Sequence, residues 1–98
     1  MKAIGYYHTG SIDREEALLD LDLPRPTATG RDLLVEVQAV SVNPVDTKIR
    51  RGAAPEAGQA RVLGFDAVGI VRETGPDVSL FKIGDAVWYA GAIDRPGS

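Results

Sequence analysis

Apolar and polar residues alternate over two stretches of the chain. In Leu19–Leu23, leucines at every second position are separated by aspartates. In Leu33–Val42, Val35, Val37 and Ala39 face one way. A period of two is typical of a half-buried β-strand, so both stretches are predicted to be strands. Three further segments are weaker strand candidates: Lys2–Tyr7, Ala67–Glu73 and Ala86–Ala90.

The alternation in Leu33–Val42 changes phase before its end. Val40 and Val42 are apolar on either side of Ser41, which reverses the order set by the preceding residues. A shift of one residue moves side chains to the opposite face of a sheet, and a β-bulge allows such a shift. We therefore predict a bulge or bend near Ala39–Val40.

A short helix is predicted over Pro44–Arg51. Asn43 can cap its first turn, and proline suits the first helical position. Asp46 would complement the positive end of the helix dipole. Gly52 ends the helix, and Ala53–Ala60 is predicted to be a loop.

Turn-forming residues recur along the whole chain. It contains 11 glycines and 6 prolines in 98 residues, which divide it into short segments. Regularly spaced short strands favour an all-β barrel or sandwich. The expected fold class is mainly β, with one short helix at about residues 44–51, and the length is that of one domain.

Composition excludes several classes of function. The formal net charge is −3 and the only basic cluster is Arg50-Arg51, so we expect no nucleic-acid partner. No apolar run is long enough for a membrane span, and no membrane partner is expected. The chain has no cysteine, which excludes disulfides and thiolate metal sites and fits a reducing compartment. A cytoplasmic location is the expectation.

Three ordered blocks resemble one superfamily. They are Ala39–Asp46, Leu63–Val71 and Phe81–Val87. Together they are similar to the N-terminal, GroES-like catalytic domain of the medium-chain dehydrogenases/reductases. The form Val42–Asp46 resembles the zinc-free branch, which includes the quinone oxidoreductases and the zinc-type alcohol dehydrogenase-like proteins. The resemblance implies a partial β-barrel in which residues 1–98 form the first part of the catalytic domain, truncated before the Rossmann domain.

The departures from the zinc-dependent members are informative. Those members have a cysteine ligand where this sequence has Asn43, and a histidine ligand where it has Phe65. A catalytic zinc takes about three protein ligands plus an open position, and Asp66 alone cannot hold the ion. We expect no metal site.

The resemblance implies an NADPH-dependent enzyme. The full-length protein would transfer a hydride from NADPH to a quinone, enone or carbonyl, and the fragment alone would be inactive. Asn43, Pro44 and Val45 would contact the nicotinamide end of the cofactor, with Asn43 offering an amide donor. Asp46 would orient the loop and Lys48 would present a cation, so Asn43, Asp46 and Lys48 are the candidate catalytic residues. Phe65 would form a wall of the substrate pocket.

Each of these residues also has a purely structural interpretation. Asn43 could be only a helix cap, Asp46 a first-turn acid, Lys48 a solvated helix residue and Phe65 plain core. No glycine-rich dinucleotide fingerprint occurs in the chain. An alternative function is therefore a GroES-like binding or chaperone-type module, although Gly52–Arg61 lacks the apolar anchor that such a module would need. Unpaired strand edges predict a homodimer or a strand-swapped pair.

Overall fold

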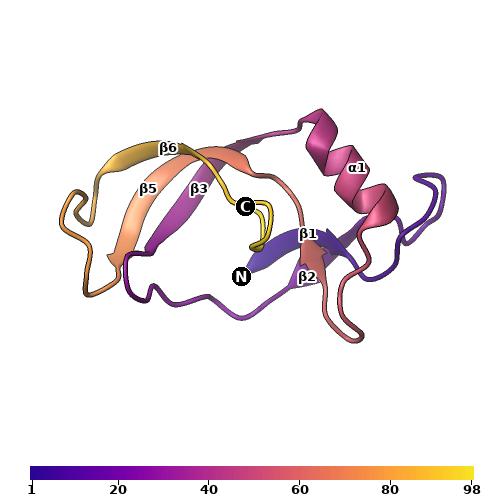
Figure 1. Ribbon diagram of the computed structural model, residues 1–98, viewed down its shortest axis with the longest axis horizontal. Helices are drawn as coiled ribbons and strands as arrows, with labels where there is room; N and C mark the ends of the chain where they lie inside the picture. Colours follow the sequence, from indigo (N-terminus) through magenta and orange to yellow (C-terminus); the bar gives the residue numbers. More distant parts are fainter.

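Two three-stranded antiparallel sheets form the framework of the structure, a computed structural model that describes all 98 residues (Figure 1). Their strand orders are β2-β1-β4 and β3-β5-β6, and neither sheet closes on itself. The elements in chain order are β1 (Lys2–Tyr6), β2 (Leu19–Asp22), β3 (Leu33–Ser41), α1 (Pro44–Gly52), β4 (Arg61–Val62), β5 (Asp66–Thr74) and β6 (Ala86–Ala90). The predicted fold class, a mainly β and incomplete barrel with one short helix, is confirmed. No helix in the structure has both the length and the apolar character needed to cross a membrane.

The predicted elements are present, with small shifts at their ends. The helix extends through Gly52, one residue further than predicted. β5 runs from Asp66 to Thr74, one residue beyond the predicted strand at each end, and it includes Gly69. The two-residue strand β4 was not predicted, because two residues are too few to show an alternating pattern.

The predicted irregularity in β3 lies slightly earlier than expected. Val37 pairs with Gly69 and Ala39 pairs with Val68, so Gln38 is the extra residue of a bulge. Gln38 is polar and stands where the alternation expects a polar residue, so the bulge leaves no mark in the pattern at that point. The change of phase becomes visible only at Val40. Next to the bulge, a Cβ on Gly69 would fall within contact distance of the Glu36 carbonyl oxygen, so the close approach of β3 and β5 requires glycine.

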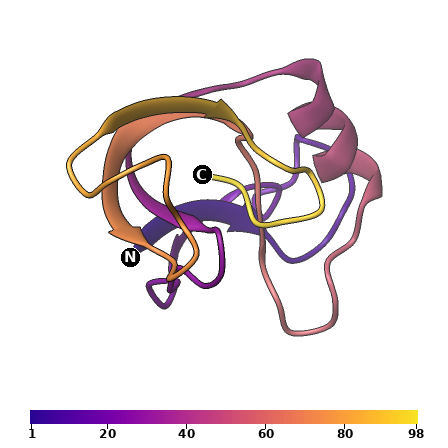
Figure 2. The same cartoon turned by 60° about the vertical axis from the view of Figure 1, so that its left-hand side comes forward.

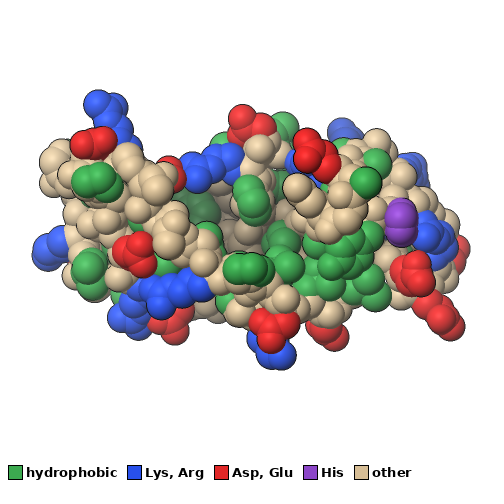
Figure 3. All heavy atoms as spheres, turned by 90° about the horizontal axis from the view of Figure 1, so that it is seen from below, with side chains coloured by type: hydrophobic (Ala, Val, Ile, Leu, Met, Phe, Trp, Pro, Cys, Tyr) green, Lys and Arg blue, Asp and Glu red, His purple; other side chains and the backbone are tan.

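The sheet β3-β5-β6 has one covered face and one open face. Along β5, Ala67, Gly69 and Val71 are buried, whereas Val68 between them is exposed. The open face also carries Trp88, which is 84% exposed. Hydrophobic side chains form patches among the charged ones and line a central hollow on the side of the molecule drawn in Figure 3. The buried core is small, consisting of Tyr6, Ala17, Val62, Phe65, Ala67 and Val71.

Two contacts outside the sheets fix the relative positions of the elements. The fully buried Tyr6 hydroxyl lies 2.7 Å from the Ala53 carbonyl oxygen and 3.0 Å from that of Ile49, so β1 holds the end of α1. Burial raises the pKa of Tyr6, which keeps this hydroxyl a donor. At the other end of the chain, the N–H of Ser98 donates to the Gly64 carbonyl at 2.7 Å. Both views show this last segment running inside the curve of β3-β5-β6 (Figures 1 and 2).

Candidate active site at the start of α1

Asn43 occupies the position between the end of β3 and the first turn of α1. Its backbone is extended, with φ −127° and ψ 164°, and Pro44 begins the helix after it. Asp46 accepts the Asn43 N–H through Oδ2 at 2.8 Å, and its own N–H donates to the Asn43 carbonyl at 3.0 Å. Asn43 and Asp46 are arranged as a capping box, in which the Asn43 side chain faces the Asp46 N–H without forming a full capping hydrogen bond. The stronger half of the box is the bond that Asp46 accepts, and the Asn43 Nδ2 group remains available for other contacts.

The carboxylate of Asp46 also connects α1 to the loop before β5. Its Oδ1 accepts the backbone N–H of Gly64 at 2.8 Å, and the residue is only 4% exposed. Gly64 has a φ of +87°, and a Cβ there would lie 2.6 Å from Cγ2 of Val40. A side chain at this position would be both strained and crowded. Asp46 thus holds the Gly64 loop against the first turn of α1, and it does not line the groove described below.

The Asn43 side chain turns toward β5. Its Nδ2 donates to Oδ2 of Asp66 at 2.9 Å, and Ser41 Oγ donates to its Oδ1 at 3.4 Å. Ser41 ends β3 and Asp66 begins β5, and the two residues are paired in the sheet register. The sheet therefore places a hydroxyl, an amide and a carboxylate at one corner.

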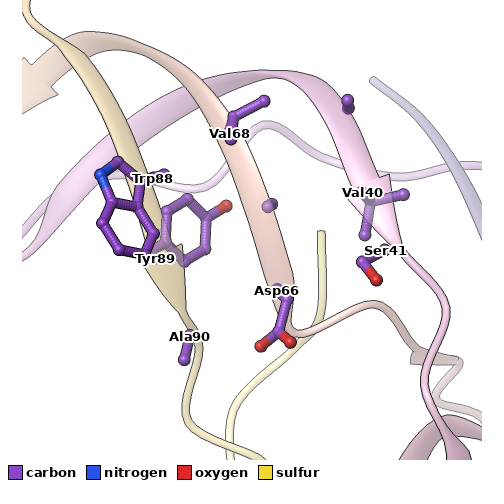
Figure 4. Close-up of a pocket in the computed structure, with 9 residues that line it drawn as sticks. Val40, Ser41, Asp66, Val68, Trp88, Tyr89 and Ala90 are labelled. Atoms are coloured by element: carbon purple, nitrogen blue, oxygen red, sulfur yellow. The ribbon is translucent and has the colours of Figure 1, made fainter.

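A shallow groove of about 400 Å³ extends from this corner across the open face of the sheet. Figure 4 shows Asp66 and Ser41 at one end of it, with Val68 and Trp88 further along on β5 and β6. Val68 and Trp88 are directly paired, which places their side chains side by side on the same face. The nine lining residues, seven of them hydrophobic, are Ala39, Val40, Ser41, Asp66, Ala67, Val68, Trp88, Tyr89 and Ala90. An apolar surface with polar groups at one end is typical of a site for a ring-containing small molecule.

The other predicted site residues lie apart from this corner. Lys48 is exposed and forms no ion pair. The buried residues of α1 are Asp46 and Arg50, and Lys48 lies two positions from each, on the opposite side of the helix. It therefore lies on the solvent side of α1. Phe65 is only 4% exposed and does not line the groove, so in this chain it is a core residue. Pro44 is exposed and Val45 half-buried in the first turn.

Sequence reasoning selected none of the nine residues that line the groove as a site residue. Asp66 was considered only as a potential metal ligand, and neither Ser41 nor Trp88 was selected. Their roles depend on which residues face each other across β3, β5 and β6, and that register depends on the bulge at Gln38. The acidic residue directly before the apolar run Ala67–Val71 was the one available signal.

The polar groups of the corner are poor ligands for a transition metal. No group of three or more histidine, cysteine, aspartate or glutamate side chains comes together anywhere in the chain. Asn43 and Asp66 are already bonded to each other, and Phe65 has no donor atom.

Comparison with known proteins gives a consistent result. A model of the alcohol dehydrogenase GroES-like domain matches residues 29–96. A zinc-type alcohol dehydrogenase-like protein of Staphylococcus epidermidis is 44% identical over the whole chain, which covers 29% of that protein. A structure from Rhizobium etli CFN 42, provisionally described as a zinc-dependent alcohol dehydrogenase, is 54% identical with a TM-score of 0.95. The match covers the whole of this chain and 28% of the R. etli chain. The Escherichia coli quinone oxidoreductase, solved in complex with NADPH, is 30% identical with a TM-score of 0.81. The match covers 94% of this chain and 27% of the E. coli chain. The chain thus spans less than a third of the length of these relatives.

Proposed function

The chain belongs to the family of alcohol dehydrogenase GroES-like domains, and on that premise we propose that it is the substrate-side part of an oxidoreductase that uses NADPH without zinc. The acceptor that we propose is a quinone, an enone or another activated carbonyl. Residues 1–98 would supply the first part of the catalytic domain, and the remainder of a longer protein would supply the dinucleotide-binding domain. A cytoplasmic location is part of this proposal.

The observation that carries the proposal is the contact of Asn43 with Asp66 at the polar end of the apolar groove. A nicotinamide ring is flat and carries one carboxamide, so it requires an apolar surface and a polar partner at its edge. The groove offers Val68 and Trp88 as surface. The Asn43 amide does not itself line the groove, but it donates to Asp66, which lines the polar end. These residues fit the nicotinamide end of the cofactor. NADPH supplies the hydride when bound.

The residues of the chain would then act by positioning. Asp46 holds the helix start and the Gly64 loop together through two hydrogen bonds, so it fixes the backbone that carries Asn43. The Asn43 amide has one more N–H, which could polarise an acceptor carbonyl, and an oxygen, which could accept an N–H from the carboxamide. Lys48 could approach a ligand only from the solvent side of α1. Phe65 would support the site from the core.

The absence of zinc is proposed from the side chains that stand at the ligand positions. An amide at 43 and a phenyl ring at 65 replace the thiolate and imidazole that bind zinc strongly. The relatives from S. epidermidis and R. etli carry the word zinc in their names, and a measurement of the metal content of this protein tests the proposal directly.

The test uses the full-length protein, dialysed against a chelator. We expect it to oxidise NADPH in the presence of a quinone or enone acceptor, with no gain in rate on addition of zinc. NADPH binding, measured by quenching of its fluorescence, provides an independent result. A protein that neither binds NADPH nor turns it over would support the binding-module alternative.

A further inference from the structure

We infer that Asp66 is a positioning residue that makes Asn43 a hydrogen-bond acceptor toward the carboxamide of the cofactor; this inference rests on the proposed function. An ionised carboxylate can only accept hydrogen bonds. The Asn43 amide must therefore turn its nitrogen toward Asp66, and the 2.9 Å distance between Nδ2 and Oδ2 shows that it does. The opposite amide orientation would place two oxygens against each other.

A second contact is consistent with the same orientation. Ser41 Oγ lies 3.4 Å from Asn43 Oδ1 and donates to it. One amide orientation thus satisfies both neighbours, because the carboxylate needs a donor and the hydroxyl can supply one. The Ser41 bond is long, so Asp66 contributes the larger share of the restraint.

Within residues 1–98, no other group competes for Asp66. Its side chain is exposed and forms no ion pair with any lysine or arginine of this chain, so Asn43 is its hydrogen-bonding partner here. The neighbouring carboxylate, Asp46, cannot replace it, since both of its oxygens are held by backbone N–H groups.

The orientation determines what the amide can offer a ligand. One N–H is used by Asp66, and donation to a negative group polarises the amide and strengthens its oxygen as an acceptor. The ligand group that suits such an oxygen is an N–H donor, which the nicotinamide carboxamide provides and a quinone or enone oxygen does not. Asn43 would then select and orient the cofactor, and Asp66 would hold Asn43 in that state.

The test compares two cofactors on the full-length protein. Dissociation constants are measured by fluorescence for NADPH and for its reduced 3-acetylpyridine analogue, in which a methyl ketone replaces the carboxamide and removes its N–H groups. Losing one hydrogen bond of this kind costs roughly three- to tenfold in affinity. We expect the wild type to prefer NADPH by about that factor, and Asn43→Ala and Asp66→Ala to lose the preference. Asp66→Asn keeps the shape and one acceptor oxygen, so it should restore part of it.

Glu36→Gln is the matched control. Glu36 is another exposed carboxylate, on β3, and it pairs with Arg72 at 2.6 Å. It should keep the wild-type preference, and circular dichroism should show that all variants are folded. The inference is overturned if Asp66→Ala binds both cofactors in the wild-type ratio, or if Glu36→Gln loses the preference equally.

The outcomes also separate this inference from the proposed function. If the protein binds NADPH with the expected ratios but reduces no acceptor, the proposed function fails while the role of Asp66 is supported. If it turns over NADPH and Asp66→Ala changes nothing, the role of Asp66 fails alone. If it does not bind NADPH, both fail.

Discussion

Oδ1 of Asp46 accepts the backbone N–H of Gly64 at 2.8 Å, although the two residues are 18 positions apart in the sequence. The other oxygen of the same carboxylate accepts the N–H of Asn43. A single buried side chain thus joins the end of β3, the first turn of α1 and the loop that leads into β5. The corner that carries Asn43 and Asp66 depends on this connection.

Replacing Asp46 is therefore expected to destabilise the domain. Asp46→Ala removes two charge-assisted hydrogen bonds and leaves two donors unpaired, which should lower the free energy of unfolding by about 3 kcal/mol. Asp46→Asn keeps one acceptor oxygen and should lose roughly half as much. Urea denaturation measures both changes. Lys48→Ala, on the exposed side of the same helix, should stay within about 0.5 kcal/mol of the wild type, and an equally small change for Asp46→Ala would contradict this role.

Asn43→Ala distinguishes a site residue from a helix cap. If Asn43 contacts cofactor or acceptor, kcat/KM of the full-length protein should fall about ten- to a hundredfold, because one directed hydrogen bond near the reacting centre is lost. If Asn43 only caps α1, the change should cost about 1 kcal/mol of stability and leave turnover unchanged. Since Asp46 makes the better capping bond, we expect the first result.

Thr47→Ala is the control for the Asn43 variant. Its hydroxyl donates to the Pro44 carbonyl at 2.8 Å in the same turn of the helix, away from the groove. It should show a small loss of stability and normal kinetics. A lowered melting temperature with unchanged kcat/KM for Asn43→Ala would remove that residue from the site.

Much of this architecture could be predicted from the chain alone, and the reasons are local. The alternation in Leu19–Leu23 and Leu33–Val42 identifies strands, and Asn-Pro identifies the start of the helix. The contact between Asn43 and Asp66 could not be predicted in the same way. It depends on how β3 and β5 are paired, and that register shifts twice, at Gln38 on β3 and at Arg72 on β5. The exposed position of Lys48 likewise depends on which side of α1 packs against β1.

The ion pair of Asp32 with Arg95 predicts a specific dependence of stability on pH. Both guanidinium Nη atoms donate to the carboxylate, at 2.9 and 3.1 Å, and these bonds lower the pKa of Asp32 below its ordinary value. A carboxyl group with a lowered pKa stabilises the fold above the pKa of the unfolded chain, about 3.9, and the benefit is lost as pH falls toward the folded-state value.

Asp32→Asn should therefore be less stable than the wild type at neutral pH, and the difference should shrink below about pH 4. Denaturation curves recorded from pH 7 to pH 2.5 test this. Asp77→Asn, at an exposed aspartate with no ion pair, should not show the same convergence. A difference for Asp32→Asn that stays constant through the acid range would contradict the prediction.

The metal content is predicted from the residues at positions 43 and 65. Without thiolate or imidazole there, dialysed full-length protein should contain far less than one zinc per chain. Inductively coupled plasma mass spectrometry gives the ratio directly. The double variant Asn43→Cys with Phe65→His, which restores the two missing ligand types, is the positive control and should retain more zinc than the wild type. Stoichiometric zinc in the wild type would refute the prediction.

The edge strand β6 predicts self-association of the 98-residue chain. β6 has a neighbour on one side only, so its other edge offers unpaired backbone groups, and Trp88 on this strand is 84% exposed. Such an edge recruits another strand, and pairing of two copies would also cover apolar surface. Light scattering should show the mean mass rising with concentration toward that of a dimer, or of a strand-swapped pair. Trp88→Lys places a charge on the edge strand and should restore the monomer. A mass that stays monomeric up to millimolar concentration would show that this edge is already protected.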